Sequence, residues 1–245
     1  MRALILNSGM GRRMGELTSE HPKCMTELRG GETILSRQLT ILRSAGIVDV
    51  IMTTGYFDRI LVDYCASLGL DLRFVFVNNP LYETTNYIYS IHLAREHLDD
   101  DILSLHGDLV FEADVVRKLL EQPESRMTVS TTLPLPPKDF KAVLRDGFVR
   151  KVGVEFFENA VAAQPLYSLK RADWKLWLDG IERFCEEGRT DVYAENVFNE
   201  ISGICRIHPL DVGDMLCAEV DTPEDLAMIR ERLDRPTERK EAYIQ

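Results

Sequence analysis

Short apolar runs alternate with amphipathic segments along the first part of the chain. Each run holds four to six mostly apolar residues, the length of a buried strand. These runs are residues 3–6, 48–53, 72–77 and 102–105. The segments between them place apolar side chains at i, i+3 and i+4, as in a helix with one buried face. These segments are residues 33–45, 60–68 and 86–98. The alternation predicts an α/β fold, with an open, mostly parallel sheet and helices on both faces.

The pattern changes near Pro134. Two short apolar segments flank Asp146-Gly147, a pair that favours the tight turn of a β-hairpin. Further strands are expected at residues 127–132, 167–169, 204–208 and 215–220, and further helices at 113–120, 172–187 and 193–202. Thr222-Pro223 starts a final helix with a capping hydroxyl and a first-turn proline. These signals predict one domain over residues 1–233 with a small β-rich insertion, followed by a polar tail at 234–245.

The composition limits the classes of molecule that this protein is expected to bind. The chain has 245 residues, 45% of them apolar and 28% charged, with a formal net charge of −11. That charge argues against broad binding to nucleic acids or anionic membranes, which need a basic surface. No run of about 18 apolar residues predicts a membrane span, and no leader pattern predicts a signal peptide. The five cysteines are scattered without a CxxC pair, which favours a reducing cytoplasm over a disulfide framework.

A glycine-rich loop follows the first apolar run. Gly9 and Gly11 stand one residue apart, Arg12 and Arg13 come next, and Lys23 lies ten residues further on. Glycine allows a positive φ and lets a ligand approach the backbone N–H groups closely. Such N–H groups, together with three cations, suit a polyphosphate. A plain turn with solvated arginines is the alternative, because a short glycine motif is a weak signal on its own.

Carboxylates follow two other expected strands. Asp108 comes directly after Gly107 at the end of an apolar run, and ligands of parallel sheets bind at such carboxyl ends. Glu219 and Asp221 flank Val220, so period-two alternation places both acids on one face. Mg²⁺ would relieve the repulsion between neighbouring carboxylates. The alternatives are a solvated turn for Asp108 and a helix-capping role for Asp221.

Other nucleotide and metal signatures are absent from the sequence. A GxGxxG site would need glycine at position 14, where Met14 stands, and no acid closes the second apolar run. No GK[ST] sequence marks a Walker A loop, and Ser8 is not in a GxSxG elbow. The five histidines show no metal-ligand spacing. The absence of these motifs therefore argues against a standard dinucleotide site, a P-loop and an α/β-hydrolase nucleophile.

Several motifs together resemble a known superfamily. The first reads Gly9-x-Gly11-x-Arg13-Met14 and is followed by Leu17-Thr18 and Pro22-Lys23. It resembles the signature of the sugar-phosphate nucleotidyltransferase superfamily. The segments Tyr82–Ser90 and Glu219–Leu226 are similar to the phosphocholine cytidylyltransferase branch. The resemblance covers nearly the whole chain and implies a Rossmann-like nucleotidyltransferase fold.

The resemblance implies a transfer in which an acceptor oxygen attacks the α-phosphorus of a nucleoside triphosphate and expels pyrophosphate. It implies that Lys23 stabilises the α-phosphate, while Arg13 and the loop hold the β- and γ-phosphates. It also implies that Asp108 and Asp221 hold Mg²⁺, with Glu219 as an outer partner. Positioning and charge neutralisation are what such a transfer needs most.

The resemblance also implies a set of nucleotide-binding residues. They are Leu6, Asn7, Ser8, Gly9, Met10, Gly11, Arg12, Asn86, Ser90 and Gly107. Helix capping is the alternative role of Asn86, and packing on the helix surface is that of Ser90. Asn7-Ser8 replaces an Ala-Ala pair that is usual in the superfamily, and Tyr87 stands where a second asparagine is usual. Contacts with the base are therefore expected to differ from the common pattern.

The resemblance implies that residues 134–210 shape the acceptor site. The residues implied there are Lys141, Tyr167, Tyr193 and Glu195. Aromatic faces and a carboxylate suit a quaternary amine such as choline. Trp174 and Trp177 fit the stripe of a core-facing helix better than an acceptor pocket. Gly153-Val154 departs from the usual pattern, so the identity of the acceptor stays open.

These observations predict a cytoplasmic, Mg²⁺-dependent cytidylyltransferase that joins CMP from CTP to a small phosphorylated acceptor such as phosphocholine. Acceptors such as 2-aminoethylphosphonate or a phosphorylated amino acid are open as well. One alternative is a sugar-1-phosphate nucleotidyltransferase that uses UTP, TTP or GTP. Another is a silent homologue that binds the nucleotide without turnover, against which the intact charged motifs speak. No nucleic-acid or membrane partner is expected, and a homodimer is compatible with the resemblance.

Overall fold

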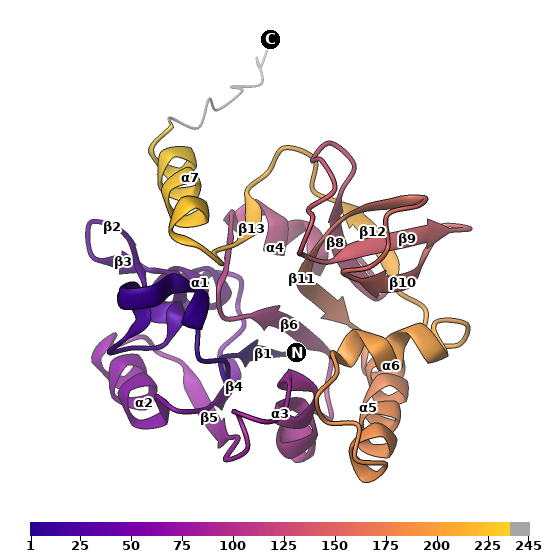
Figure 1. Cartoon of the computed structure of the whole chain (residues 1–245), viewed down its shortest axis with the longest axis horizontal. Coiled ribbons are helices and arrows are strands. Elements are labelled where there is room, and N and C mark those ends of the chain that lie inside the picture. Colours follow the sequence, from indigo (N-terminus) through magenta and orange to yellow (C-terminus); the bar gives the residue numbers. More distant parts are fainter. Residues whose placement is uncertain (236–245) are drawn as a thin grey trace.

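The structure is a computed structural model that describes residues 1–235, so the predicted polar tail at 234–245 lies almost wholly outside the described residues. Parallel strands form one side of the central sheet, from β6 to the edge strand β5 (Figure 1). They are β1 (Arg2–Leu6), β4 (Asp49–Thr54), β5 (Arg73–Asn78) and β6 (Ile102–His106). β1 lies between β4 and β6, with Ala3 opposite both Val50 and Leu103. The predicted parallel sheet is confirmed.

Helices cover both faces of this sheet. On one face pack α1 (Ile34–Ser44), α2 (Asp58–Ser67) and α4 (Ala113–Leu120), and on the other α3 (Tyr87–Ala94), α5 (Arg171–Glu186) and α6 (Ala194–Ile201). Ala3 and Ile5 of β1 point into the first core and Leu4 into the second, because alternate strand residues face opposite sides. Trp174 and Trp177 are each 2% exposed in the second core, as the helix-stripe interpretation expected.

Antiparallel strands extend the sheet beyond β6. They are β8 (Arg126–Ser130), β9 (Lys141–Arg145), β10 (Phe148–Gly153) and β11 (Ala160–Leu169), and β12 (His208–Asp211) runs parallel to β8. β11 is the hub, because it pairs with β6, β8 and β9. β9 and β10 form the predicted hairpin, and Asp146 and Gly147 in its turn have φ of 54° and 77°.

Two strands differ from the prediction. β11 begins at Ala160 instead of residue 167, because its first half, Ala-Val-Ala-Ala-Gln-Pro, is rich in alanine and contains a proline, which are weak signals for a strand. Residues 204–207 form no strand; Cys205 and Ile207 are buried there, but pairing starts only at His208, opposite Arg126. An apolar pattern reports burial, and it does not show which residues find a hydrogen-bonding neighbour.

Several small elements complete the fold. β7 (Leu109–Phe111) and β13 (Cys217–Glu219) form a separate antiparallel pair, and β2 (Glu27–Arg29) and β3 (Glu32–Thr33) form another. The 3-10 helices are η1 (Arg12–Thr18), η2 (Lys23–Met25) and η3 (Arg95–His97). α7 (Pro223–Asp234) begins as predicted, with the Thr222 hydroxyl accepting a hydrogen bond from Asp225 N–H. The β7–β13 pair places Glu219 opposite Leu109, next to Asp108.

Gly180 lets α5 approach α6 closely, since a Cβ there would lie 2.4 Å from Val197 Cγ1. Gly180→Ala should lower the free energy of unfolding by about 1–3 kcal/mol through overpacking, although alanine is the better helix former. Urea unfolding measures this loss. Adding Val197→Ala should remove part of it, so the double variant should lose less than the sum of the single losses. Additive losses would contradict the contact.

Candidate active site

Three chain segments meet at one edge of the central sheet. β1 leads into the glycine-rich loop, β6 leads into Gly107-Asp108, and β13 leads into Val220-Asp221. The pairing of β13 with β7 brings the last two together, because Val220 N–H donates to the carbonyl of Asp108 at 3.0 Å. Ligands of open α/β sheets bind at such carboxyl ends. The loop and the acids that the sequence predicted are therefore neighbours.

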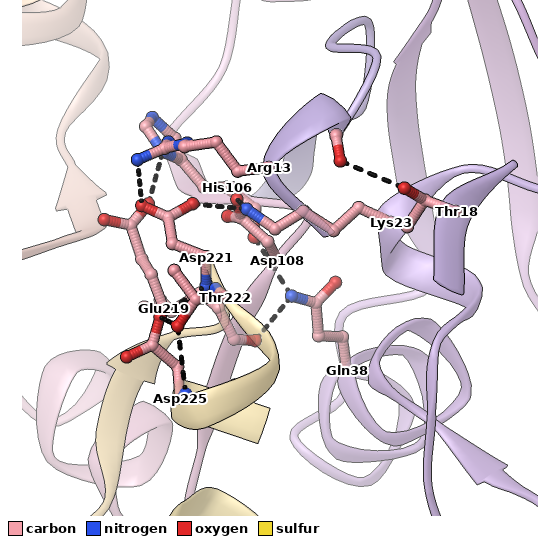
Figure 2. Close-up of polar contacts among 12 residues, drawn as sticks. Arg13, Thr18, Lys23, Gln38, His106, Asp108, Glu219, Asp221, Thr222 and Asp225 are labelled. Carbon is pink, nitrogen blue, oxygen red and sulfur yellow. Dashed lines mark hydrogen bonds and ion pairs between the residues drawn. The ribbon is translucent and has the colours of Figure 1, made fainter. Parts of the chain in front are cut away.

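Lys23 lies between two aspartates (Figure 2). Its ammonium donates to Asp108 Oδ2 and to Asp221 Oδ1, each at 2.5 Å. Arg13 adds a second cation, with its guanidinium 2.9 Å from Asp221 Oδ2. The side chains of Lys23, Asp108 and Asp221 are 12%, 20% and 13% exposed. The predicted proximity of the two carboxylates is thus present, and Lys23 is the cation that joins them.

In this cluster, burial and the neighbouring charges shift the pKa values in opposite directions. Burial disfavours the ammonium of Lys23, but the carboxylates of Asp108 and Asp221 outweigh burial and hold its pKa above the usual value. Burial also raises the pKa of Asp108, but Lys23 and His106 outweigh it, so the pKa of Asp108 is lowered overall. Lys23 and Asp108 therefore both stay charged at neutral pH.

His106 and Glu219 form a second pair beside the first (Figure 2). His106 Nδ1 lies 2.9 Å from Glu219 Oε1, and both side chains are mostly buried. Burial and the charge of Asp108 raise the pKa of Glu219 to about 7, against the effect of His106. Burial lowers the pKa of His106, but Glu219 outweighs it and the pKa is raised. The sequence analysis missed His106, although two-residue alternation along β6 could have placed it beside Asp108.

The residues present fit a divalent cation. One ligand atom each from His106, Asp108 and Glu219 lie within 4.8 Å of one another. Asp108 Oδ1 is buried and has no hydrogen-bond partner among residues 1–235. Carboxylate oxygens are the ligands that Mg²⁺ prefers. Asp221 reaches the same cluster through Lys23, so the three predicted metal ligands are close together.

The glycine-rich loop lines a cavity of about 380 Å³ beside this cluster. Within residues 1–235, the backbone N–H groups of residues 9–13 donate to no protein acceptor, which leaves them free for phosphate oxygens. Gly11 has a φ of 63°, and a Cβ there would lie 3.1 Å from Lys23 Cβ. Of the predicted nucleotide-binding residues, this cavity is lined by Leu6, Asn7, Gly9, Met10, Gly11 and Arg12.

A second cavity, of about 290 Å³, adjoins the first. Both cavities are lined by Leu6, Gly9, Tyr82 and Asp108. Ser8 also lines the second cavity, and its Oγ lies 2.7 Å from Ser90 Oγ, which accepts a bond from Asn79 Nδ2 at 3.0 Å. Asn86 lines it too, while its side chain caps α3 by accepting from Tyr87 N–H. These polar groups suit the edge of a nucleobase.

Gly107 lines neither cavity, and its lack of a side chain leaves room for Asn7. A Cβ at Gly107 would lie 1.6 Å from Asn7 Oδ1, so the Asn7 amide occupies the place where another residue would carry its side chain. Gly107 N–H donates to the carbonyl of Leu6 at 3.0 Å and ties the two strand ends together. The asparagine that departs from the usual alanine therefore depends on glycine in the neighbouring strand end.

Lys141, predicted to contact the acceptor, is fully buried. Its ammonium donates to the carbonyl of Pro136 at 2.7 Å and lies 4.1 Å from the centre of the Phe157 ring. Burial lowers the pKa of Lys141, and the charges of Asp139 and Glu155 oppose this effect. In this structure Lys141 holds the connection between β8 and β9, and its contact with an acceptor stays a prediction.

The other predicted acceptor residues lie near a buried carboxylate. Glu195 is 3% exposed and accepts hydrogen bonds from the hydroxyls of Tyr167, at 2.8 Å, and Tyr87. Tyr193 is 38% exposed and its ring lies 5.8 Å from that of Tyr87. The structure therefore brings Tyr167, Glu195 and Tyr193 together around Tyr87. Tyr87 also packs edge-on against His106, at 4.9 Å between ring centres, and the sequence analysis gave it no role.

A protein-family profile matches most of the segments that form this site. The profile of the MobA-like NTP transferase domain matches residues 3–172. The chain belongs to the MobA-like NTP transferase domain family. The matched residues include the glycine-rich loop, Lys23 and Asp108, whereas Glu219 and Asp221 lie beyond them.

Curated relatives of this MobA-like domain are named for CMP or CTP. The chain is 30% identical over 255 aligned positions to the CMP-5'-(3-aminopropyl)phosphonate synthase of Streptomyces rubellomurinus, covering 98% of this chain and 40% of that protein. It is 30% identical over 130 positions to the CTP:phosphoglutamine cytidylyltransferase of Campylobacter jejuni, covering 51% and 50%. The chain thus spans half or less of the length of these relatives.

A solved structure shows the same fold. The CTP:phosphocholine cytidylyltransferase from Streptococcus pneumoniae superposes with a TM-score of 0.75 and 19% identity, over 95% of this chain and 98% of that one. None of the helices in residues 1–235 combines the length and the apolar content that crossing a membrane requires. The predicted nucleotidyltransferase fold is confirmed.

Lys23→Met tests the charged cluster. It leaves two mostly buried carboxylates without their shared ammonium, so the free energy of unfolding at pH 7 should fall by about 3 kcal/mol. In the wild type the pKa of Asp108 is lowered, so its stabilisation is present above the ordinary aspartate pKa of about 3.9 and is lost as pH falls through the lowered value.

In the variant, Asp108 no longer faces the ammonium, so burial and repulsion should raise its pKa in the folded state, and protonation should relieve that repulsion. The stability difference between wild type and variant, measured by urea unfolding, should therefore shrink from pH 7 to pH 4. Lys175→Met, on an exposed surface of α5, is the matched control and should change stability by less than about 0.5 kcal/mol. A difference that stays constant with pH would contradict the shared ammonium.

Proposed function

We propose that this protein is a Mg²⁺-dependent cytidylyltransferase that transfers CMP from CTP to a small phosphorylated acceptor and releases pyrophosphate. The observation that carries the proposal is Lys23, held at 2.5 Å by both Asp108 and Asp221 beside the cavity of the glycine-rich loop. A cation and two acids beside a loop with free N–H groups can bind and neutralise a triphosphate substrate. The same pair of acids gives the site a means of holding a metal.

In the proposed reaction, an oxygen of the acceptor's phosphate or phosphonate attacks the α-phosphorus of CTP. The new P–O bond forms as the bond from the α-phosphorus to the bridging oxygen breaks, and pyrophosphate leaves with that electron pair. Lys23 would stabilise the charge that grows on the α-phosphate, and Arg13 and the loop N–H groups would hold the β- and γ-phosphates. Asp108 and Asp221, with Glu219 behind them, would hold Mg²⁺, which neutralises phosphate charge when bound.

Substrate binding depends on the local charge of the cavity and not on the net charge of the protein. The net charge of −11 does not attract an anionic substrate, so binding must depend on the local cations at Arg12, Arg13 and Lys23. No protein nucleophile is needed, because positioning and neutralisation carry this type of transfer. The proposal therefore agrees with a site that holds charged and polar groups but no activated serine or cysteine.

The choice of CTP and of the acceptor class is supported by the names of the relatives. Two of those names pair CMP with aminopropylphosphonate and CTP with phosphoglutamine, and a third relative, from Haemophilus influenzae, is named choline-phosphate cytidylyltransferase. Each acceptor combines a phosphate or phosphonate with a nitrogen-containing group. We therefore propose an acceptor of this kind, phosphocholine among them, and a cytoplasmic enzyme. The five free cysteines, four of them buried, are compatible with that compartment.

A pyrophosphate-release screen tests the proposal. CTP, UTP, TTP and GTP are each combined with phosphocholine, 2-aminoethylphosphonate, phosphorylated amino acids and hexose-1-phosphates in the presence of Mg²⁺. We expect release with CTP and a nitrogen-containing acceptor, and loss of about 100-fold or more in Asp108→Ala, measured well below the temperature at which the variant unfolds. Release with a hexose-1-phosphate would identify the sugar-nucleotide alternative. Nucleotide binding without release from any pair would identify a silent homologue.

A further inference from the structure

Glu195 is a buried carboxylate that joins three elements of the fold. It lies in the first turn of α6, and the residue is 3% exposed. Within residues 1–235 its carboxylate has two hydrogen-bond partners, the hydroxyl of Tyr167 in β11, at 2.8 Å, and the hydroxyl of Tyr87 in α3. A buried charge costs free energy, and these O–H donors offset part of that cost. The two hydroxyls therefore tie α6 to α3 and to β11.

The start of α6 is itself fixed in place. Trp177 of α5 is 2% exposed, and its Nε1 donates to the carbonyl of Ala194 at 2.8 Å. The connection between α5 and α6 also reaches α3, because Asn86 N–H donates to the carbonyl of Thr190 at 2.8 Å. α3, α5 and α6 lie on one face of the sheet (Figure 1). The three helices thus hold the buried carboxylate as one packed unit.

Tyr87 carries this attachment to the expected nucleotide site. Its ring packs edge-on against the ring of His106, with 4.9 Å between the ring centres and 66° between the planes. Tyr87 and His106 both line the second cavity, of about 290 Å³. Together with Glu195 they also line a small hollow of about 10 Å³, the room of about one water molecule. The two rings therefore border the cavity on one side and the surroundings of Glu195 on the other.

His106 extends the chain of contacts to the charged cluster. Its Nδ1 lies 2.9 Å from Glu219 Oε1 (Figure 2). Glu219 is two residues before Asp221, which belongs to the cluster. Consecutive contacts thus connect the buried carboxylate of α6, by way of two rings, with an acid of the predicted metal site.

Tyr87 is the member of this chain of contacts that departs from the common pattern, in which asparagine is usual at this position. An asparagine has neither a ring to pack on His106 nor a hydroxyl to donate to Glu195. The connection between the buried carboxylate and the imidazole is therefore a property of this chain and not of the common motif.

The burial of Glu195 argues against direct contact with an acceptor. Both of its carboxylate oxygens already accept a hydrogen bond, and the residue lines neither of the two cavities beside the charged cluster. An acceptor would have to displace a tyrosine hydroxyl to reach it. A role that acts through Tyr87 needs no such displacement.

We propose that Glu195 is a positioning residue: it holds the Tyr87 ring against His106 and thereby supports the acids of the predicted metal site. This inference rests on the proposed function and deepens it, because it gives that site a support that reaches it from another helix. Neither Glu195 nor the Tyr87 hydroxyl is expected to touch a substrate. Loss of the support should therefore lower turnover and leave acceptor binding nearly as it is.

A matched pair of tyrosine variants tests the proposal by NMR. Tyr87→Phe and Tyr167→Phe each remove one hydroxyl from the same buried carboxylate, so urea unfolding should show similar losses of stability. The first variant leaves the ring on His106 without its attachment, whereas the ring of Tyr167 packs against Trp177. The ring signals of ¹⁵N-labelled histidine report the imidazole directly, and the variant His106→Gln assigns those of His106.

The His106 signals should shift or broaden in Tyr87→Phe and change less in Tyr167→Phe. The signals of His21 and His208 should stay in place in both variants, since their ring nitrogens contact Pro22 and Gly147, outside this chain of contacts. Unmoved His106 signals in Tyr87→Phe, or equal changes in the two variants, would overturn the proposal. This readout needs neither nucleotide nor turnover, so it decides the proposal even if no nucleotide and acceptor pair releases pyrophosphate and the proposed function fails.

Turnover gives the second readout. With the nucleotide and acceptor that release pyrophosphate, Tyr87→Phe should lower kcat about tenfold, or about 1.4 kcal/mol in the barrier, and change the acceptor KM by less than about twofold. Tyr167→Phe should lower kcat by a smaller factor. Equal losses of kcat in the two variants would show a general loosening of the core and overturn the proposal.

Glu195→Gln separates positioning from direct contact with the acceptor. The amide oxygen of glutamine accepts from one hydroxyl and its NH₂ group donates to the other, so the attachment of Tyr87 is kept. Positioning predicts kcat and acceptor KM within about threefold of the wild type, whereas Glu195→Ala should lower kcat about tenfold, as in Tyr87→Phe. A rise of the acceptor KM by about tenfold or more in Glu195→Gln would show that the charge binds the acceptor and would overturn the proposal.

Discussion

The ammonium of Lys23 lies between two carboxylates that stand 85 and 198 residues further along the chain. Without it, Asp108 and Asp221 would face each other at low exposure, and their repulsion would oppose the pairing of β13 with β7. The same contact fixes the distance from the glycine-rich loop to both acids, because Gly11 packs against Lys23 and Arg13 reaches Asp221. One charge-assisted contact therefore organises both the phosphate side and the metal side of the site.

The fold supplies the frame for this contact through strand ends. β1 and β6 are adjacent, so their carboxyl ends place the loop and Asp108 together, and the short β7–β13 pair adds Asp221 from the end of the chain. The two cores support the sheet, and α3 and α6 bring Tyr87 and Glu195 to its edge. The antiparallel region around β11 borders the other side of Glu219.

Residues with strong local signals could be placed from the sequence. Alternating apolar runs predicted β1, β4, β5 and β6, and the Asp146-Gly147 pair predicted its hairpin. Gly11, Lys23, Asp108 and Asp221 carried motif or strand-end signals, and they do meet. Alternation along β6 could place His106 beside Asp108, but its bond to Glu219 and that of Tyr87 to Glu195 depend on contacts across the fold.

The account depends on the two acids and the loop binding one nucleotide and one ion together. The most direct measurement is a crystal structure with Mn²⁺ in place of Mg²⁺ and a non-hydrolysable CTP analogue, in which anomalous scattering locates the ion. The account predicts an ion bonded to carboxylate oxygens of both Asp108 and Asp221, with the triphosphate on the N–H groups of residues 9–13 and Lys23 turned toward the α-phosphate. A nucleotide bound elsewhere, or an ion that touches neither aspartate, would contradict it.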